Sequence, residues 1–455
     1  MTWTPDEARA LARSILEQSK ADECEVSLTS TRSSHTRFAA NDVTTSGTLR
    51  DASVTITSKG GGRAGAVTLN EIEPEALRDA VARSHELMSV APVDPEFVEG
   101  LGPQTYEEIQ AFHEETAAAG ADRRRDGVRA ALETARTKGL EASGFYETEA
   151  SWSAIANTRG LFGFHRATTA SCSNTLRTKD GTGSGWAGFQ SPRIGDIRPD
   201  ELAAVAARKA SASASPTDLE PGRYTVILEP RAVADLLGNL GFALSGRAAD
   251  EGRGYFAKPE GGTRVGEKLF SEAVTLLSDP FDPRMPGRPW AGGGGGGGGG
   301  GFGGGGGGTF LGLPSRKVTW IEKGVVKNLS IDRYWAARTK KEPIPFGSSL
   351  VLQGGKGSLE DLIAGTDRGL LVTRFWYIRV VNPQTLQLTG LTRDGVWLVE
   401  KGKVVRPVNN FRFNESPAAM LAKVEAMSEA VSTGTMVVPG IRALDFNFSS
   451  KSDAV

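Results

Sequence analysis

The chain has 455 residues, of which 39% are hydrophobic and 24% are charged. These proportions are ordinary for folded proteins, and the length exceeds what one hydrophobic core usually serves, so two or three domains are expected. The 53 basic and 54 acidic residues give a formal net charge of -1. This balance provides no global reason to expect a nucleic acid or an anionic membrane as a partner.

The N-terminal sequence and the two cysteines indicate a cytoplasmic location. Acidic residues occur early, and no apolar segment has the length of a signal-peptide core. No stretch approaches the roughly 18 consecutive apolar residues of a membrane-spanning helix. Cys24 and Cys172 are far apart and form no CxxC unit, so neither a disulfide framework nor a cysteine-based zinc site is expected.

Residues 1–92 have the pattern of an N-terminal α+β domain with a mostly antiparallel sheet. Thr4, Pro5 and Glu7 form the capping box and first turn of a helix that carries one apolar face. Strands are predicted at residues 24–28, 52–56 and 64–69, and a second helix at 74–88.

Residues 93–221 form a middle α+β segment, which opens with a linker rich in proline, glycine and acidic residues. Helical patterns occur at residues 106–118, 123–137 and 199–211, and alternating strand patterns occur between 142 and 190. We predict that this segment is a layer of the main body rather than an independent module.

Residues 222–455 are predicted to form a large β-rich C-terminal domain. It begins with a strand at 223–228 and a helix at 232–245, and two Glu-Lys-Gly sequences, at 322–324 and 400–402, predict tight hairpins. The tract 292–308 is all glycine except for Phe302, which predicts a mobile loop because glycine has no side chain to bury. The fold class is therefore α+β.

The four histidines do not form a zinc-protease motif. Such a motif needs two histidines one helical turn apart, but the residues four positions after His85 and His113 are Ser89 and Ala117. Both histidines are expected on ordinary helix surfaces.

Two further patterns have simple structural interpretations. The segment 354–358 resembles a fragment of a phosphate loop, but a helix capped by Ser358, with Asp361 three residues later, explains it better. The run from Arg374 to Arg379 alternates like a strand, which would place Phe375 and Tyr377 on one face. That face is either buried or a surface for binding peptides, and the sequence leaves both open.

The order of several segments resembles the TldD/PmbA metalloprotease family over nearly the whole chain. The segments that carry the resemblance are residues 36–43, 264–280, 320–329, 381–390 and 406–410. In the catalytic TldD branch of that family, a helix before the second of these segments carries HExxxH, and a cysteine near the C-terminus supplies a third zinc ligand.

Alignment on the shared Leu-Leu pair places Gly238 and Ala243 where the two histidines would stand, and Asn239 where the glutamate would stand. Residues 433–440 contain no cysteine. Glycine and alanine cannot coordinate zinc, and an asparagine amide cannot act as a general base. The chain is therefore similar to the PmbA (TldE) branch, which lacks HExxxH.

The resemblance implies a non-catalytic subunit of a peptidase complex that processes extended peptides. It implies no metal or cofactor in this chain, zinc in a TldD-like partner, and either that partner or a second copy of this chain as the other subunit. No nucleic acid or membrane partner is expected. Arg374, Tyr377 and Asn382 are the residues expected to line the peptide cleft.

Two alternatives remain open. The first is a homomeric peptide-binding or assembly protein with no role in proteolysis. The second is an enzyme with its chemistry rebuilt around His165, Glu147 and Asp180, which no spacing in the sequence supports.

Overall fold

The computed structural model describes residues 2–292, 311–346 and 349–452. It has the predicted α+β class: one antiparallel sheet dominates the N-terminal part, and the C-terminal part is rich in strands. The predicted mobile loop at 292–308 lies, apart from Gly292, outside the described residues.

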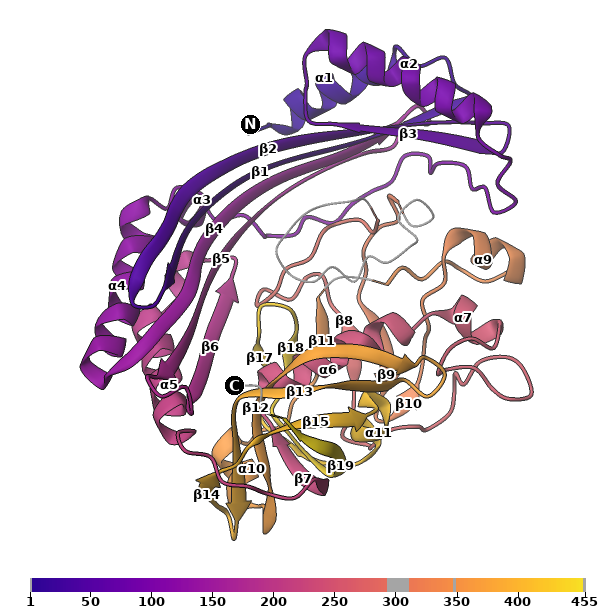
Figure 1. Ribbon diagram of the computed structural model, residues 1–455. Coiled ribbons are helices and arrows are strands. Elements are labelled where there is room, and N and C mark those ends of the chain that lie inside the picture. The colour runs from indigo at the N-terminus through magenta and orange to yellow at the C-terminus, as the bar shows by residue number, and fades with distance from the viewer. Residues whose placement is uncertain (1, 293–310, 347–348, 453–455) are drawn as a thin grey trace.

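The N-terminal sheet has six antiparallel strands in the order β3-β2-β1-β4-β5-β6. They are β1 (Glu23–Ala39), β2 (Asp42–Gly60), β3 (Arg63–Leu69), β4 (Leu140–Asn157), β5 (Phe162–Thr178) and β6 (Ser184–Ser191). Strands from residues 1–92 and from 93–221 thus share one sheet, which arches over the C-terminal domain (Figure 1).

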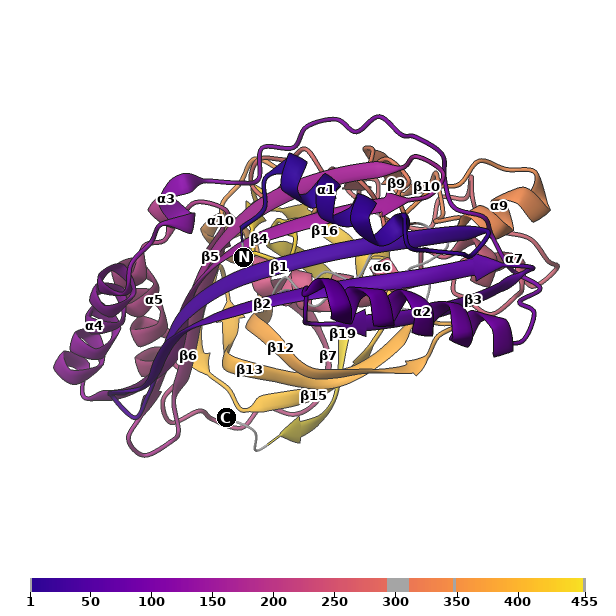
Figure 2. The same ribbon diagram turned by 90° about the horizontal axis from the view of Figure 1, so that it is seen from above.

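Helices cover the convex face of this sheet at its two ends (Figures 1 and 2). At one end lie α1 (Pro5–Leu16) and α2 (Pro74–Val90). At the other lie α3 (Glu114–Ala117), α4 (Ala121–Lys138), the short 3-10 helix η1 (Ile194–Asp196) and α5 (Pro199–Ala212). The predicted capping box of α1 is confirmed, because Thr4 and Glu7 exchange hydrogen bonds.

The two faces of the sheet differ in composition because alternate residues of a strand point to opposite sides. On the convex face, β4 buries a row of apolar side chains that includes Ala142, Tyr146, Ala150 and Trp152. The concave face carries many hydroxyl side chains: Ser27, Thr29, Thr31 and Ser33 of β1, Ser151 and Ser153 of β4, and Thr169, Ser171, Ser173 and Thr175 of β5. The side of the sheet that faces the C-terminal domain is therefore polar.

The C-terminal domain contains two further sheets. One has the order β10-β9-β8-β11-β18-β17 and the other the order β12-β7-β19-β15-β13-β14, with β16 paired to β19. The strands are β7 (Gly222–Leu228), β8 (Leu276–Ser278), β9 (Val318–Glu322), β10 (Val325–Val326), β11 (Leu350–Leu352), β12 (Arg368–Asn382), β13 (Gln387–Glu400), β14 (Lys403–Pro407), β15 (Asn410–Glu415), β16 (Val424–Met427), β17 (Val431–Ser432), β18 (Val437–Val438) and β19 (Ile441–Ser452).

Pairing of β12 with β13 closes the strands β12, β7, β19, β15 and β13 into a ring. Its core is aromatic: Phe375, Phe411, Phe413, Phe446 and Phe448 are buried and contact one another. The helices of this domain are α6 (Pro230–Ala243), α7 (Gly246–Asp250), α9 (Arg333–Thr339), α10 (Leu359–Ala364) and α11 (Pro417–Ala422). Among the described residues, no helix is long and apolar enough to cross a membrane.

Both predicted Lys-Gly hairpins are confirmed. Lys323 and Gly324 turn β9 into β10 with φ values of 47° and 81°, and Lys401 and Gly402 turn β13 into β14 with values of 49° and 74°. Two successive positive φ angles are what the favoured two-residue hairpin turns need, and glycine adopts them without steric cost.

The helix predicted at 106–118 is wrong except for its last turn, α3. Residues 106–113 instead form no regular element and lie beside β5, where the backbone N–H of Thr168 donates to the Ala111 oxygen over 2.9 Å. The side chains of Ile109 and Ala111 are both buried, and the Ala111 N–H turns back to donate to the Ile109 oxygen over 3.0 Å. The apolar spacing in this segment therefore serves contact with the sheet edge, not a helical face.

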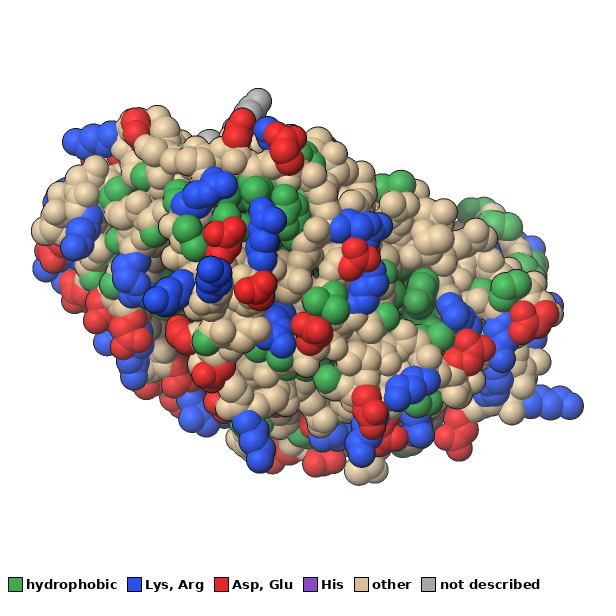
Figure 3. All heavy atoms as spheres, turned by 90° about the horizontal axis from the view of Figure 1, so that it is seen from below, with side chains coloured by type: hydrophobic (Ala, Val, Ile, Leu, Met, Phe, Trp, Pro, Cys, Tyr) green, Lys and Arg blue, Asp and Glu red, His purple; other side chains and the backbone are tan. Residues whose placement is uncertain are grey.

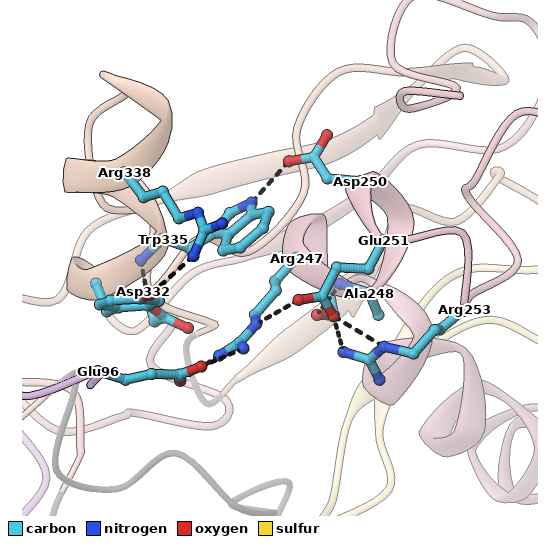
Figure 4. Close-up of polar contacts among 11 residues, drawn as sticks. Glu96, Arg247, Ala248, Asp250, Glu251, Arg253, Asp332, Trp335 and Arg338 are labelled. Carbon is cyan, nitrogen blue, oxygen red and sulfur yellow. Dashed lines mark hydrogen bonds and ion pairs between the residues drawn. The ribbon is translucent and has the colours of Figure 1, made fainter. Parts of the chain in front are cut away.

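The linker after α2 is fixed to the C-terminal domain by a charged cluster (Figure 4). Arg247 of α7 donates from two nitrogens to the Glu96 carboxylate, over 2.6 and 2.5 Å, and from Nε to Glu251 over 3.0 Å. Trp335 of α9, whose indole donates to Asp250 over 2.7 Å, lies beside the Arg247 guanidinium. Two-point pairing of a guanidinium with a carboxylate fixes orientation as well as distance, so this cluster helps to position the arch over the domain below it.

Candidate functional site

Helix α6 lies beneath the concave side of the arch (Figures 1 and 2). Pro230 occupies its first turn, and an apolar stripe that includes Val233, Leu236, Leu237 and Leu240 is buried in the C-terminal core. The remaining face of the helix is half-buried or exposed and carries Arg231, Asp235, Gly238, Asn239, Phe242 and Ala243. This face includes the three positions aligned with HExxxH.

Asp235 joins α6 to strand β12. Its carboxylate pairs with Arg231 at 3.0 Å and accepts the backbone N–H of Phe375 over 3.0 Å. Burial raises the pKa of Asp235, while the charges of Arg231 and Arg374 oppose that shift. The carboxylate is therefore held as a structural acceptor between a helix and a strand.

Arg374 is the one predicted cleft residue that lies at this face. Its guanidinium is 3.7 Å from the Asp394 carboxylate and 4.8 Å from the centre of the Trp186 ring, and its side chain is only 14% exposed. Burial lowers the pKa of Arg374, and the carboxylates of Asp394 and Asp235 oppose the shift. Trp186 also lies 5.5 Å from the guanidinium of Arg231.

Asp394 completes the contact between the arch and the C-terminal domain. It is 2% exposed and accepts the Ser184 hydroxyl of β6 over 2.6 Å. Its φ of 59° lies in the left-handed region, which aspartate tolerates better than most residues. A cavity of about 390 Å³ opens beside these two side chains. We call Trp186, Arg231, Asp235, Arg374 and Asp394 the junction cluster.

The other two predicted cleft residues lie farther along β12, outside the junction cluster. Asn382 caps the β12–β13 turn, because its side-chain oxygen accepts the backbone N–H groups of Gln384 and Thr385 over 2.9 and 3.2 Å. Tyr377 is 61% exposed, and the Arg379 guanidinium lies 4.4 Å from the centre of its ring. The structure therefore distributes the three residues along one strand.

The prediction that Phe375 and Tyr377 share a face is wrong. Phe375 is 2% exposed, in the aromatic core, whereas Tyr377 projects outward. The pairing of β12 with β13 shifts between Trp376 and Arg379, and Tyr377 has a φ of 55°. This bulge interrupts the two-residue alternation, so the aromatic run presents one ring to the core and the next two to the outside.

The concave face of the arch carries the carboxylates of Glu147 and Glu149, but the residues considered for catalysis do not lie together there. Burial raises the pKa of Glu147, against the charge of His35, and burial followed by Glu147 raises that of Glu149. Glu147 pairs in register with Ser171, whereas His165 pairs with Ser153, six residues away and hence about 20 Å along the strands. The arrangement of His165, Glu147 and Asp180 considered from the sequence is therefore not formed.

His165 is buried where residues 288–291 meet the arch, edge-on to the Trp290 ring at 6.3 Å. Burial, and then the charge of Arg288, lowers the pKa of His165 to about 4. The unfolded chain binds a proton near pH 6.5, so acidification from pH 6.5 to 4 favours unfolding. The loss approaches about 3 kcal/mol at the lower limit.

Urea unfolding at several pH values tests this for the wild type and for His165→Gln. We expect the wild type to lose more stability between pH 6.5 and 4 than the variant, with similar curves above pH 7. Glu147 and Glu149, with raised pKa values, contribute in the opposite direction in both proteins, so the difference isolates His165. Identical slopes would show that the imidazole is accessible to water.

The residues present do not fit the zinc site of a metallopeptidase. In the parts of the chain that the structure describes, no group of three histidine, cysteine or acidic side chains is placed to hold a metal. On α6 itself, Gly238 and Ala243 have no donor atoms, and Asn239 offers only an amide. The outward face of α6 is instead a partly open surface that lies beside β12.

Family models of PmbA/TldA metallopeptidases match three consecutive regions of the chain: domain 1 at residues 24–87, the central domain at 99–214 and the C-terminal domain at 221–450. The chain belongs to this family. The resemblance found in the sequence is thereby confirmed, and α6 lies within the C-terminal family domain.

Three solved structures have the same fold. The crystal structure of TldE from Thermococcus kodakarensis matches with a TM-score of 0.83 and 22% identity, over 97% of this chain and 99% of that one. Structures described as putative modulators of DNA gyrase match with TM-scores of 0.82 and 18% identity. The one from Thermotoga maritima covers 97% of this chain and 100% of its own, and the one from Bacteroides thetaiotaomicron covers 98% and 99%. A search of curated proteins finds no match.

Most of the junction cluster could not be predicted from the sequence. Trp186, Asp235 and Asp394 belong to three separate regions of the chain and meet only through the fold. The Asp394-Gly395 dipeptide is a local signal, because Asp-Gly is typical of a hairpin turn. Both residues do have positive φ, but they lie within β13, where they form an irregularity of the strand and not a turn.

Proposed function

We propose that this chain is a cytoplasmic, non-catalytic subunit of a PmbA/TldA-type peptidase that processes extended peptides. The observation that carries the proposal is the outward face of α6, where a family fold is retained but glycine, asparagine and alanine stand at the positions aligned with HExxxH. A zinc-bearing, TldD-like subunit would supply the chemistry. This chain would line part of the substrate cleft and would offer a strand edge with which the substrate pairs.

The geometry around α6 supports a role in holding an extended chain. Beyond Val372, β12 has no strand paired to its outer edge in the described structure, because β7 pairs only with Leu370, Leu371 and Val372. Apart from the Phe375 N–H, which already donates to Asp235, this edge offers main-chain donors and acceptors to an extended peptide. The hydroxyl side chains on the concave face of the arch offer further hydrogen bonds without demanding a particular side chain of the peptide.

Co-expression with a relative that carries HExxxH tests the proposed partnership. We expect the two chains to co-purify and to bind unstructured peptides. The alternative, a homomeric peptide-binding protein with no role in proteolysis, predicts that only this chain is retrieved, while peptides still bind and stay intact. Retrieval of the single chain from such a co-expression would favour that alternative.

Replacing Tyr377 with alanine separates peptide capture from stability. The ring is 61% exposed, so we expect the unfolding free energy to change by less than about 1 kcal/mol. Peptide affinity should fall because an exposed aromatic contact is removed. Phe375→Ala is the matched control: that ring is in the core, and its loss should cost about 3–5 kcal/mol. A large loss of stability in Tyr377→Ala would contradict its placement outside the core.

A further inference from the structure

The hairpin formed by the outer parts of β12 and β13, residues 373–393, has an unusual composition. It contains three arginines, Arg374, Arg379 and Arg393, and no aspartate or glutamate. It also exposes four large apolar side chains, at 44–61% of their surface: Trp376, Tyr377, Val380 and Val381. We call this segment the β12–β13 arm.

The three arginines differ in how they are neutralised. Arg374 and Arg393 stand directly opposite each other in the strand pairing, and both lie near Asp394, at 3.7 and 4.0 Å. Arg379 has no carboxylate within ion-pair distance among the described residues; it donates to the backbone oxygen of Ile378 over 2.8 Å and stacks on Tyr377. Its charge is therefore available to a bound molecule.

The aromatic side chains extend the same surface. The centre of the Trp376 ring lies 4.5 Å from the Arg393 guanidinium and 5.9 Å from that of Arg374. Basic and apolar side chains of the arm are therefore neighbours at Trp376. A guanidinium that lies over an aromatic ring can still donate hydrogen bonds in its own plane. A guanidinium presented this way binds a carboxylate through two parallel hydrogen bonds.

We infer that the β12–β13 arm selects extended peptide segments that combine acidic and apolar side chains. This inference rests on the proposed peptide role and adds the class of substrate. Main-chain pairing would use the open edge of β12, carboxylates would pair with Arg379, and apolar side chains would cover Trp376, Tyr377, Val380 and Val381. A peptide rich in lysine or arginine would instead meet the unneutralised charge of Arg379, with no aspartate or glutamate on the arm to compensate it.

Fluorescence anisotropy with three labelled, unstructured twelve-residue peptides tests the inference. The peptides share apolar positions and carry four glutamates, four glutamines or four lysines. For the full-length protein we expect the glutamate peptide to bind about ten- to a hundredfold more tightly than the lysine peptide, as one or two charge-assisted hydrogen bonds imply. Arg379→Glu should lose this preference and gain affinity for the lysine peptide.

Arg129→Glu is the matched control, because Arg129 is exposed on α4 and has no ion pair in the described chain. It changes the net charge equally and should leave the preference unchanged. Equal binding of all three peptides would overturn the charge selection while leaving peptide handling in place, whereas no binding of any peptide would count against both proposals. Loss of peptide binding as protein concentration rises, with dimers seen by sedimentation, would show that a second copy covers the arm and would also overturn the inference.

Discussion

Replacing Asp394 with alanine is expected to lower the free energy of unfolding by about 3–5 kcal/mol. The carboxylate is 2% exposed, and it is the nearest acid to Arg374, whose side chain is only 14% exposed. Its removal leaves a buried guanidinium without its main counter-charge and frees the Ser184 hydroxyl. Since Ser184 belongs to the arch, the loss should also loosen the contact between the arch and the C-terminal domain.

Asp445 provides a matched control for this substitution. It has a similar φ, 57° against 59°, and it also pairs with two basic side chains, Lys423 at 2.5 Å and Arg223 at 3.1 Å. Its side chain, however, is 45% exposed. Asp445→Ala should therefore cost only about 1 kcal/mol. Urea denaturation measures the free energy of unfolding of both variants. Equal losses of unfolding free energy would show that burial of the Asp394 ion pair contributes nothing to stability.

The second large effect concerns activity. The isolated chain is expected to hydrolyse no peptide, since Gly238 and Ala243 cannot bind zinc and Asn239 cannot accept a proton from water at neutral pH. Activity should appear when an HExxxH-bearing relative is added, because that chain would bring both the metal and the general base. The single chain should have no activity and the pair should be active. This difference is larger than the change in activity expected from any substitution of a residue that lines the site.

Local signals in the sequence predicted the local structure well. Ser358 and Asp361 form the capping box of α10, as expected from their spacing alone. The Lys-Gly turns are equally local, because one pair of residues sets both φ angles. The apolar stripe of the helix predicted at 232–245 likewise corresponds to α6, which is buried along that stripe.

Features that depend on distant contacts were not predictable in this way. Ile109 and Ala111 belong to a segment with helical spacing, yet the segment is held against the edge of β5, where the Thr168 N–H donates to the Ala111 oxygen. The sequence near Tyr377 does not predict its positive φ, because tyrosine rarely adopts that conformation. The bulge belongs to the pairing of β12 with β13, which depends on residues distant in the sequence. The junction cluster similarly requires the arch and the C-terminal domain to be in place.

The most direct measurement is peptide hydrolysis and zinc content for three samples: this chain, an HExxxH-bearing relative, and the co-purified pair. We expect no stoichiometric zinc and no hydrolysis in this chain alone, and zinc with hydrolysis in the pair. Replacing the relative's HExxxH glutamate should abolish the activity of the pair, whereas Asn239→Ala in this chain should preserve it. Zinc-dependent hydrolysis by the purified single chain would contradict the account.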